Sequence, residues 1–140
     1  MKRLLVFLIF LSISTGCALF AQHTLTVEIT GIKKIKGNLM LALFDSEESY
    51  VSNKYTGKIV KVKGNSAMIV IEGLKEGKYA ISVFQDENEN GKMDTRLFGI
   101  PKEKYGFSNN INASKIRRQP TFLECGFEVK EDKQIVIKLI

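Results

Sequence analysis

The sequence has little of the chemistry that enzymes most often use. It contains one histidine, His23, and two cysteines among 140 residues. His23 lies outside every motif, so a nucleophile activated by histidine is not expected, and the His and Cys ligands of a zinc site are missing. Paired carboxylates occur at Asp86 and Asp94, but a hydrolase also needs a deep cleft, which so small a domain is not expected to build. We therefore expect that the protein is not an enzyme.

Long apolar runs and prolines are also scarce. With only two prolines and no linker-like segment, the chain is expected to form one domain. Its main apolar run, residues 4–13, is about half the ~20 residues that a transmembrane helix needs, so no transmembrane span is expected. Lys2 and Arg3 precede this run, and small residues follow it up to Ala21, which is the plan of a secretory signal peptide. We predict a signal peptide at 1–21, a domain at 22–140, and a periplasmic or extracellular location.

A second processing route stays open at Cys17. Residues 14–17 read Ser-Thr-Gly-Cys, which also fits a degenerate lipoprotein signal, and Cys17 would then be the lipid anchor. If cleavage instead follows Ala21, Cys125 is the single remaining cysteine, and no intramolecular disulfide can form. Cys125 lies in a segment of alternating apolar residues, where we expect a small buried side chain.

Basic charge is present but not concentrated. The net charge is +6 at pH 7, of which Lys2 and Arg3 contribute two. The other basic residues are scattered, and aromatic residues do not interleave with them as in nucleic-acid-binding surfaces. We therefore expect a solvated basic surface and no nucleic-acid partner.

Period-two alternation runs through most of the chain after residue 22. Leu25, Val27 and Ile29, for example, alternate with polar residues, as in a strand with one wet face. The run Leu74–Tyr79 resembles a tyrosine corner, and Gly64-Asn65 suggests a hairpin. Strands are predicted at 25–29, 39–44, 60–63, 67–71, 80–85, 125–129 and 135–139. The pattern predicts an all-β fold: a single seven-stranded antiparallel β-sandwich, a Greek key of immunoglobulin or transthyretin type.

Residues 86–120 break this pattern. They are rich in Asn, Gly, Lys and Ser and show little alternation, which predicts a long irregular loop insert. Such an insert in a compact domain is usually functional or held by something specific. A functional site is therefore expected here.

The start of this insert has the composition of a cation-binding loop. Oxygen-bearing side chains recur at alternate positions before Gly91, as in the first half of the Ca²⁺ loop pattern D-x-[DN]-x-[DN]-G. Gly91 allows a sharp turn, and the main-chain carbonyl of Lys92 is a further candidate ligand. The predicted ligands are Asp86, Asn88, Asn90, Lys92 and Asp94.

The match to an EF-hand then fails. The twelfth position, which needs a bidentate Glu, is Leu97, and flanking helices are not expected. Glu103 is the nearest later carboxylate and a candidate extra ligand. With an excess of three negative charges in residues 86–94, a weak Ca²⁺ site with a dissociation constant on the order of 10⁻⁴–10⁻³ M is predicted. The alternative is a metal-free turn, because Asn, Asp and Gly favour turns by themselves.

Aromatic and amide residues gather in the second half of the insert. Tyr105, Phe107 and Asn109 are candidate partner-binding residues on a loop. The alternative is that the aromatic side chains pin the insert to the sandwich.

The motifs between Leu74 and Phe127 together resemble one family. The run LKEGKYAISVFQDENENGKMDTRLFGIPKEKYGFSNN, followed by QPTFLECGFEV, is similar to the DUF2141 family of bacterial exported proteins. Gln85 departs from the pattern, in which we expect His. The family has no assigned activity, so the resemblance implies the domain and not a function. The matching positions are Gly77, Tyr79, Ala80, Asp86, Asn88, Asn90, Gly91, Asp94, Gly99, Pro101, Glu103, Tyr105, Gly106, Phe107, Pro120 and Phe122.

The sequence thus predicts an exported, non-catalytic β-sandwich binding module with a weak structural calcium-type site in the 86–94 loop. An envelope protein or a glycan is the expected partner. The alternative is a metal-free structural or envelope-associated scaffold domain.

Overall fold

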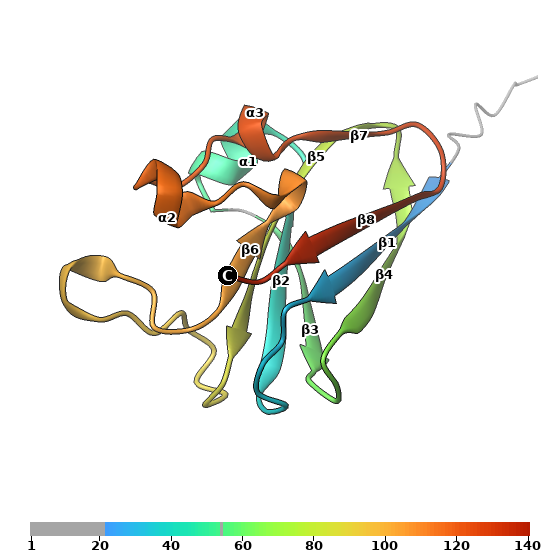
Figure 1. Ribbon diagram of the computed structural model, residues 1–140. Helices are drawn as coiled ribbons and strands as arrows, with labels where there is room; N and C mark the ends of the chain where they lie inside the picture. Colours follow the sequence, from blue (N-terminus) through green and yellow to red (C-terminus); the bar gives the residue numbers. More distant parts are fainter. Residues whose placement is uncertain (1–21, 54) are drawn as a thin grey trace, which may run out of the picture.

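The structure is a computed structural model that describes residues 22–53 and 55–140 (Figure 1). The predicted signal peptide, with Cys17, lies outside the described residues. The strands are β1 (Gln22–Thr30), β2 (Asn38–Phe44), β3 (Thr56–Lys61), β4 (Ala67–Lys75), β5 (Gly77–Asp86), β6 (Tyr105–Phe107), β7 (Phe127–Val129) and β8 (Lys133–Lys138). The helices are α1 (Glu47–Val51), α2 (Ala113–Ile116) and α3 (Phe122–Cys125), with 3₁₀ turns η1 (Leu97–Gly99) and η2 (Ser108–Asn110). In this part of the chain, no helix is long and apolar enough to cross a membrane.

The strands form two sheets, and the fold is mostly β as predicted. One sheet has the order β4-β1-β8, the other has the order β3-β2-β5-β6, and β7 pairs with β5. The predicted seven-stranded antiparallel sandwich of immunoglobulin or transthyretin type is not confirmed. The described residues contain eight strands, and β1 runs parallel to β8.

The turn at Gly64-Asn65 does not close a hairpin. β3 pairs with β2 in one sheet, and β4 pairs with β1 in the other, so the chain crosses between sheets here. The hairpin prediction was wrong because a turn sequence fixes the local reversal and not the partner of each strand.

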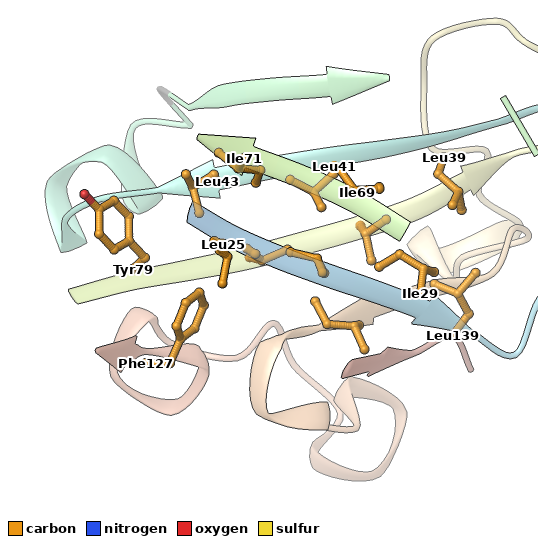
Figure 2. Packing of buried hydrophobic residues seen from close by; sticks show 14 of the residues in the cluster. Leu25, Ile29, Leu39, Leu41, Leu43, Ile69, Ile71, Tyr79, Phe127 and Leu139 are labelled. Atoms are coloured by element: carbon orange, nitrogen blue, oxygen red, sulfur yellow. The ribbon is translucent and has the colours of Figure 1, made fainter. Parts of the chain in front are cut away.

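The main core fills the space between the two sheets. Leu25, Val27 and Ile29 of β1 are 0% exposed and pack in one cluster with Leu39 and Leu41 of β2 (Figure 2). Their alternation with half-exposed residues confirms the predicted period of two. Burying one such side chain contributes about 1.5–3 kcal/mol, so this interface holds the sheets together.

A tyrosine corner joins the two sheets where β4 leads into β5. The Tyr79 hydroxyl donates to the Lys75 carbonyl oxygen at 2.9 Å, and the Tyr79 ring is 8% exposed within the main core. The predicted corner is confirmed, and it fixes the register in which β5 enters the second sheet.

A second, smaller core lies on the outer face of the five-stranded sheet. Phe44, Tyr50, Ala80, Phe122 and Cys125 form it, under α1 and α3. Cys125 is 0% exposed, as expected for a small buried side chain, but it ends α3 and does not belong to a strand. The predicted strand at 125–129 is therefore shorter, and β7 starts at Phe127.

Candidate functional site

The 86–94 loop starts where β5 ends, against the turn that precedes β2. Asp86 closes β5, pairs with Asn38 of β2 and is 1% exposed. Gly37 has φ +72°, and a Cβ at this position would lie 1.9 Å from the Asp86 carbonyl oxygen. A glycine is needed at this contact, which fixes the base of the loop.

The Asp86 carboxylate holds the first half of the loop. Asn90 N–H donates to Asp86 Oδ1 at 3.1 Å, and Gly91 N–H donates to Asp86 Oδ2 at 2.7 Å. Asn88 Oδ1 also approaches Asn90 N, at 3.3 Å. The chain curls back over the carboxylate through positive φ angles at Glu89 and Gly91, as the predicted sharp turn requires.

The predicted side-chain ligands converge at Asp94. Asn88 Nδ2 donates to Asp94 Oδ2 at 2.8 Å, and Asn90 Nδ2 donates to Asp94 Oδ1 at 3.0 Å. Lys92 N–H donates to Asn90 Oδ1 at 2.9 Å. These four residues form one hydrogen-bonded network, called the ring below: the Asn88 and Asn90 side chains bond to Asp94, and the Asp86 carboxylate holds the main chain at Asn90 and Gly91.

The Glu103 side chain links the two ends of the 86–94 loop by hydrogen bonds. Its side chain is 6% exposed, and its two oxygens accept from Glu87 N–H and Asp94 N–H, both at 2.9 Å. Glu103 thus ties the first and last parts of the loop to each other. It was a candidate extra metal ligand, and in this structure it is a clamp on the backbone.

The other two acidic side chains of the loop meet lysines on neighbouring segments. Glu87 Oε2 lies 3.0 Å from Lys34 Nζ and 3.1 Å from Lys36 Nζ, and Glu89 pairs with Lys61. The hydrogen bond from Lys34 is the main cause that lowers the pKa of the Glu87 carboxyl. The charge excess inferred from residues 86–94 alone is therefore offset by lysines that the local sequence does not contain.

The loop offers amide oxygens as well as carboxylate oxygens. No three His, Cys, Asp or Glu side chains of residues 22–53 and 55–140 are placed to hold a metal ion. The ring instead contains two carboxylates and two amides, of which the Asp86 carboxylate accepts only from main-chain N–H groups. Such a donor set is all oxygen once the amides turn their carbonyl groups inward, and oxygen is the ligand that Ca²⁺ prefers.

Beside the loop lies a groove of about 810 Å³ on the outer face of the five-stranded sheet. Tyr105 and Phe107 line it, with ring centroids 6.0 Å apart in an edge-on arrangement. Phe84 is the cross-strand partner of Tyr105, and Ser82 is the partner of Phe107, so the four side chains share one face. The segment before β6 and the residues around α2 flank this face (Figure 1).

Asn109 is not brought into the groove. Its φ is +60°, and its amide nitrogen donates to the carbonyl oxygens of Glu124 and Gly126, both at 2.9 Å. Asn109 therefore ties η2 to the end of α3. Of the three candidate partner-binding residues, Tyr105 and Phe107 line the groove, and Asn109 supports it.

Several groove residues were not singled out from the sequence. Phe84 belongs to a predicted strand, and its outward direction follows from the period of two, but nothing in the sequence shows that this face lies in a groove. Arg117 and Arg118 line the opposite rim, near α2. Arg117 and Arg118 reach the groove only because of the way α2 packs near β6. The spacing of residues along the sequence does not predict this packing.

A family model described as an uncharacterized protein conserved in bacteria, DUF2141, matches residues 27–137. The chain belongs to the DUF2141 family. None of the curated proteins and none of the solved structures compared with it matches.

Residues that the chain shares with the DUF2141 pattern occupy distinct places in the fold. Tyr79 forms the corner between the sheets, Asp86 and Asp94 hold the loop, and Glu103 clamps it. Tyr105 lines the groove. In this DUF2141 chain Gln85 is 1% exposed, and its amide nitrogen donates to the Lys34 and Lys36 carbonyl oxygens, so it anchors the 31–37 turn.

Proposed function

We propose that the protein is an exported, non-catalytic binding module in which a divalent cation of the Ca²⁺ type orders the 86–94 loop beside the binding groove. The ring formed by Asp86, Asn88, Asn90 and Asp94 carries this proposal. The leader-like pattern of residues 1–21 supports export, with lipid anchoring at Cys17 as the alternative. The groove is the face that a partner, such as an envelope protein or a glycan, would contact.

The ring is compatible with a bound cation because its oxygens keep free lone pairs. An ionised carboxylate has about four acceptor sites, and the hydrogen bonds described above use two of those on Asp86 and two on Asp94. The amide groups of Asn88 and Asn90 now point their nitrogens at Asp94. A half-turn of each amide would present oxygen at the same place, and for Asn90 this would release Lys92 N–H.

Residues 94–102 form a short hairpin that connects the ring to the groove. A cation at the ring would fix the position of this hairpin. Lys102 N–H donates to the Asp94 carbonyl oxygen at 2.8 Å, and Arg96 N–H donates to the Ile100 carbonyl oxygen at 2.7 Å. Ile100 and Met93 line the groove. Fixing Asp94 would therefore hold one wall of the groove in place, which is the role that we assign to the metal.

The composition of the groove supports binding without catalysis. The described residues that line it offer aromatic and aliphatic groups, hydroxyl groups, side-chain amides and two guanidinium groups. The Tyr105 and Ser114 hydroxyls are 2.9 Å apart and bond to each other. This set suits recognition of an apolar ligand, whereas general acid–base catalysis uses a side chain that titrates near the working pH.

A calorimetric titration of the purified protein with Ca²⁺ tests the proposal. At 10 mM Ca²⁺ and a dissociation constant of ~10⁻³ M, binding would add about 1.4 kcal/mol of stability and raise Tm by about 5 °C. Asp94→Ala should abolish the heat and the shift in Tm. Glu89→Gln is the matched control, since it removes an exposed acid of the same loop that pairs with Lys61 outside the ring.

The second candidate is a metal-free scaffold domain. It is favoured by the fact that each oxygen of the Asp86 and Asp94 carboxylates already accepts a hydrogen bond from the protein. The same titration decides between the two. An unchanged Tm and no heat at 10 mM Ca²⁺ would remove the cation site and leave the loop as a rigid turn.

A further inference from the structure

Aromatic side chains make up much of the lining of the groove. They are Phe44 of β2, Phe84 of β5, and Tyr105 and Phe107 of β6. A concave site lined mainly by apolar and aromatic groups with a few polar groups is typical of a ligand-binding site. The volume of about 810 Å³ also falls within the range of about 300–1,000 Å³ that is usual for small-molecule sites.

The charge of the groove has one sign. Arg117 and Arg118 line it, and none of the described lining residues is acidic. Arg118 is already paired, since its guanidinium donates to both Glu124 oxygens at 2.7 and 2.8 Å. Arg117 follows α2 in a left-handed conformation, with φ 54°, and among the described residues its guanidinium makes no ion pair. Arg117 therefore offers an unused set of donors for an anion beside the aromatic lining.

The wall opposite α2 ends in exposed apolar side chains. Leu97 is 81% exposed, and Phe98, with φ 63°, is 99% exposed at the tip of the hairpin that carries Ile100 into the groove. A bulky residue with positive φ is strained, and such strain is often kept for function. These two side chains are not lining residues, but they place exposed apolar surface on the hairpin that carries Ile100.

We propose that the groove binds a single-chain anionic amphiphile, with its carboxylate on Arg117 and its alkyl chain over Phe84, Phe107 and Ile100. This inference rests on the binding role proposed for the groove and not on the proposed cation site. An alkyl chain needs no hydrogen-bonding partners along the aromatic lining, and an anionic head group matches the cationic charge of Arg117.

Displacement of a fluorescent probe tests the proposal on the purified protein. N-phenyl-1-naphthylamine, an uncharged apolar dye, reports occupancy of the groove, and dodecanoate and dodecanol compete for it below their aggregation limits. Dodecanoate should displace the dye at least about tenfold more tightly than dodecanol, because hydrogen bonds to a charged head group are worth about that factor. The titrations are run with Ca²⁺ and with EDTA, so that loss of the cation site is seen separately.

Variants then test which side chains bind the head group and the alkyl chain of the ligand. Arg117→Gln should weaken dodecanoate about tenfold and leave dodecanol unchanged, and Arg117→Lys should retain most of the preference. Arg96→Gln is the matched control, because Arg96 lies on the neighbouring hairpin and is not a lining residue. Ser82→Phe fills the space between the aromatic rings and should abolish binding of both ligands. Thermal melting checks that each variant is folded.

Three outcomes would overturn the proposal in different ways. Equal affinity for dodecanoate and dodecanol, unchanged by Arg117→Gln, would leave an apolar binding groove without anion selectivity. Absence of dye binding to the wild-type protein would remove the binding role of the groove as well. A strong preference for dodecyl phosphate, or binding to phosphatidylglycerol vesicles without binding to free dodecanoate, would replace the fatty-acid-type ligand by a lipid phosphate or a membrane surface.

Discussion

Removing the Glu103 carboxylate is the perturbation that should change the loop most. Glu103 is 6% exposed and accepts two backbone N–H groups that lie seven residues apart, at Glu87 and Asp94. A hydrogen bond to a charged group contributes about 1.5–3 kcal/mol, and both donors are partly accessible to water, so we take the lower value for each. Glu103→Ala should therefore lower the free energy of unfolding by about 3 kcal/mol.

Urea denaturation measures this loss. With an m-value of about 1–3 kcal/mol/M, the midpoint should fall by about 1–3 M. Glu103→Gln keeps one acceptor oxygen and should cost about half as much. Glu131→Gln is the matched control, since Glu131 is exposed in the turn between β7 and β8. Hydrogen exchange should show faster exchange at the amides of residues 87 and 94 in the Glu103 variants.

Two results would refute the proposed role of Glu103 as a clamp on the loop backbone. A Glu103→Ala protein within about 0.5 kcal/mol of the wild type would behave like an ordinary surface substitution. Unchanged protection of the Glu87 and Asp94 amides would show that other groups hold the loop. In either case Glu103 would be free to serve as a metal ligand, and the titration with Ca²⁺ would have to be repeated on the Glu103 variants.

Three further predictions concern the framework of the fold. Tyr79→Phe should lower stability by about 1 kcal/mol in urea denaturation, because it removes the hydrogen bond to the Lys75 carbonyl oxygen and keeps the ring; an unchanged midpoint would contradict the corner. Gly37→Ala should prevent folding or lower Tm severely, because its Cβ would overlap the Asp86 carbonyl oxygen, and a wild-type melting curve would exclude that contact. Burial raises the pKa of the Cys125 thiol from 9.0 to about 11. The contribution of this thiol to stability should thus be constant below pH 9 and fall as pH rises from 9 to 11, where only the unfolded thiol ionises, and a Cys125→Ala protein should lack this component of the decline.

Strand positions were predictable because the period of two reports which side of a strand is buried. Leu25, Val27 and Ile29 were assigned to the core from alternation alone, and the structure places them there. The partner of each strand was not predictable, since the same alternation fits either sheet. The hairpin at Gly64-Asn65 failed for this reason, and so did the all-antiparallel arrangement, because β1 pairs in parallel with β8.

The short helices were missed because they are four or five residues long, which is too short for a helical period to show. A usable signal was present at the start of α3, where Thr121 and Glu124 form a capping box. α1 has a weaker form of the same motif, with Ser46 and Ser49. A search for capping motifs would have placed Cys125 on a helix and not on a strand.

Only the contacts between residues that are close in sequence could be predicted for the candidate site. The turn around Asp86 followed from residue types at fixed spacing, because its partners lie within five residues. The lysines that neutralise Glu87 and Glu89 come from β3 and from the turn before β2. The groove likewise depends on chain segments that meet only after folding, and no spacing along the chain could have revealed it.

The central position of β1 between β4 and β8 has a consequence for how the chain acquires its structure. The first strand described pairs with β4, at residues 67–75, and with β8, at residues 133–138. Until β8 has been made, one side of β1 keeps a bare row of amide and carbonyl groups, which is a template for association with other chains. A protein shortened before residue 133 should therefore aggregate, because this sheet cannot be completed without β8.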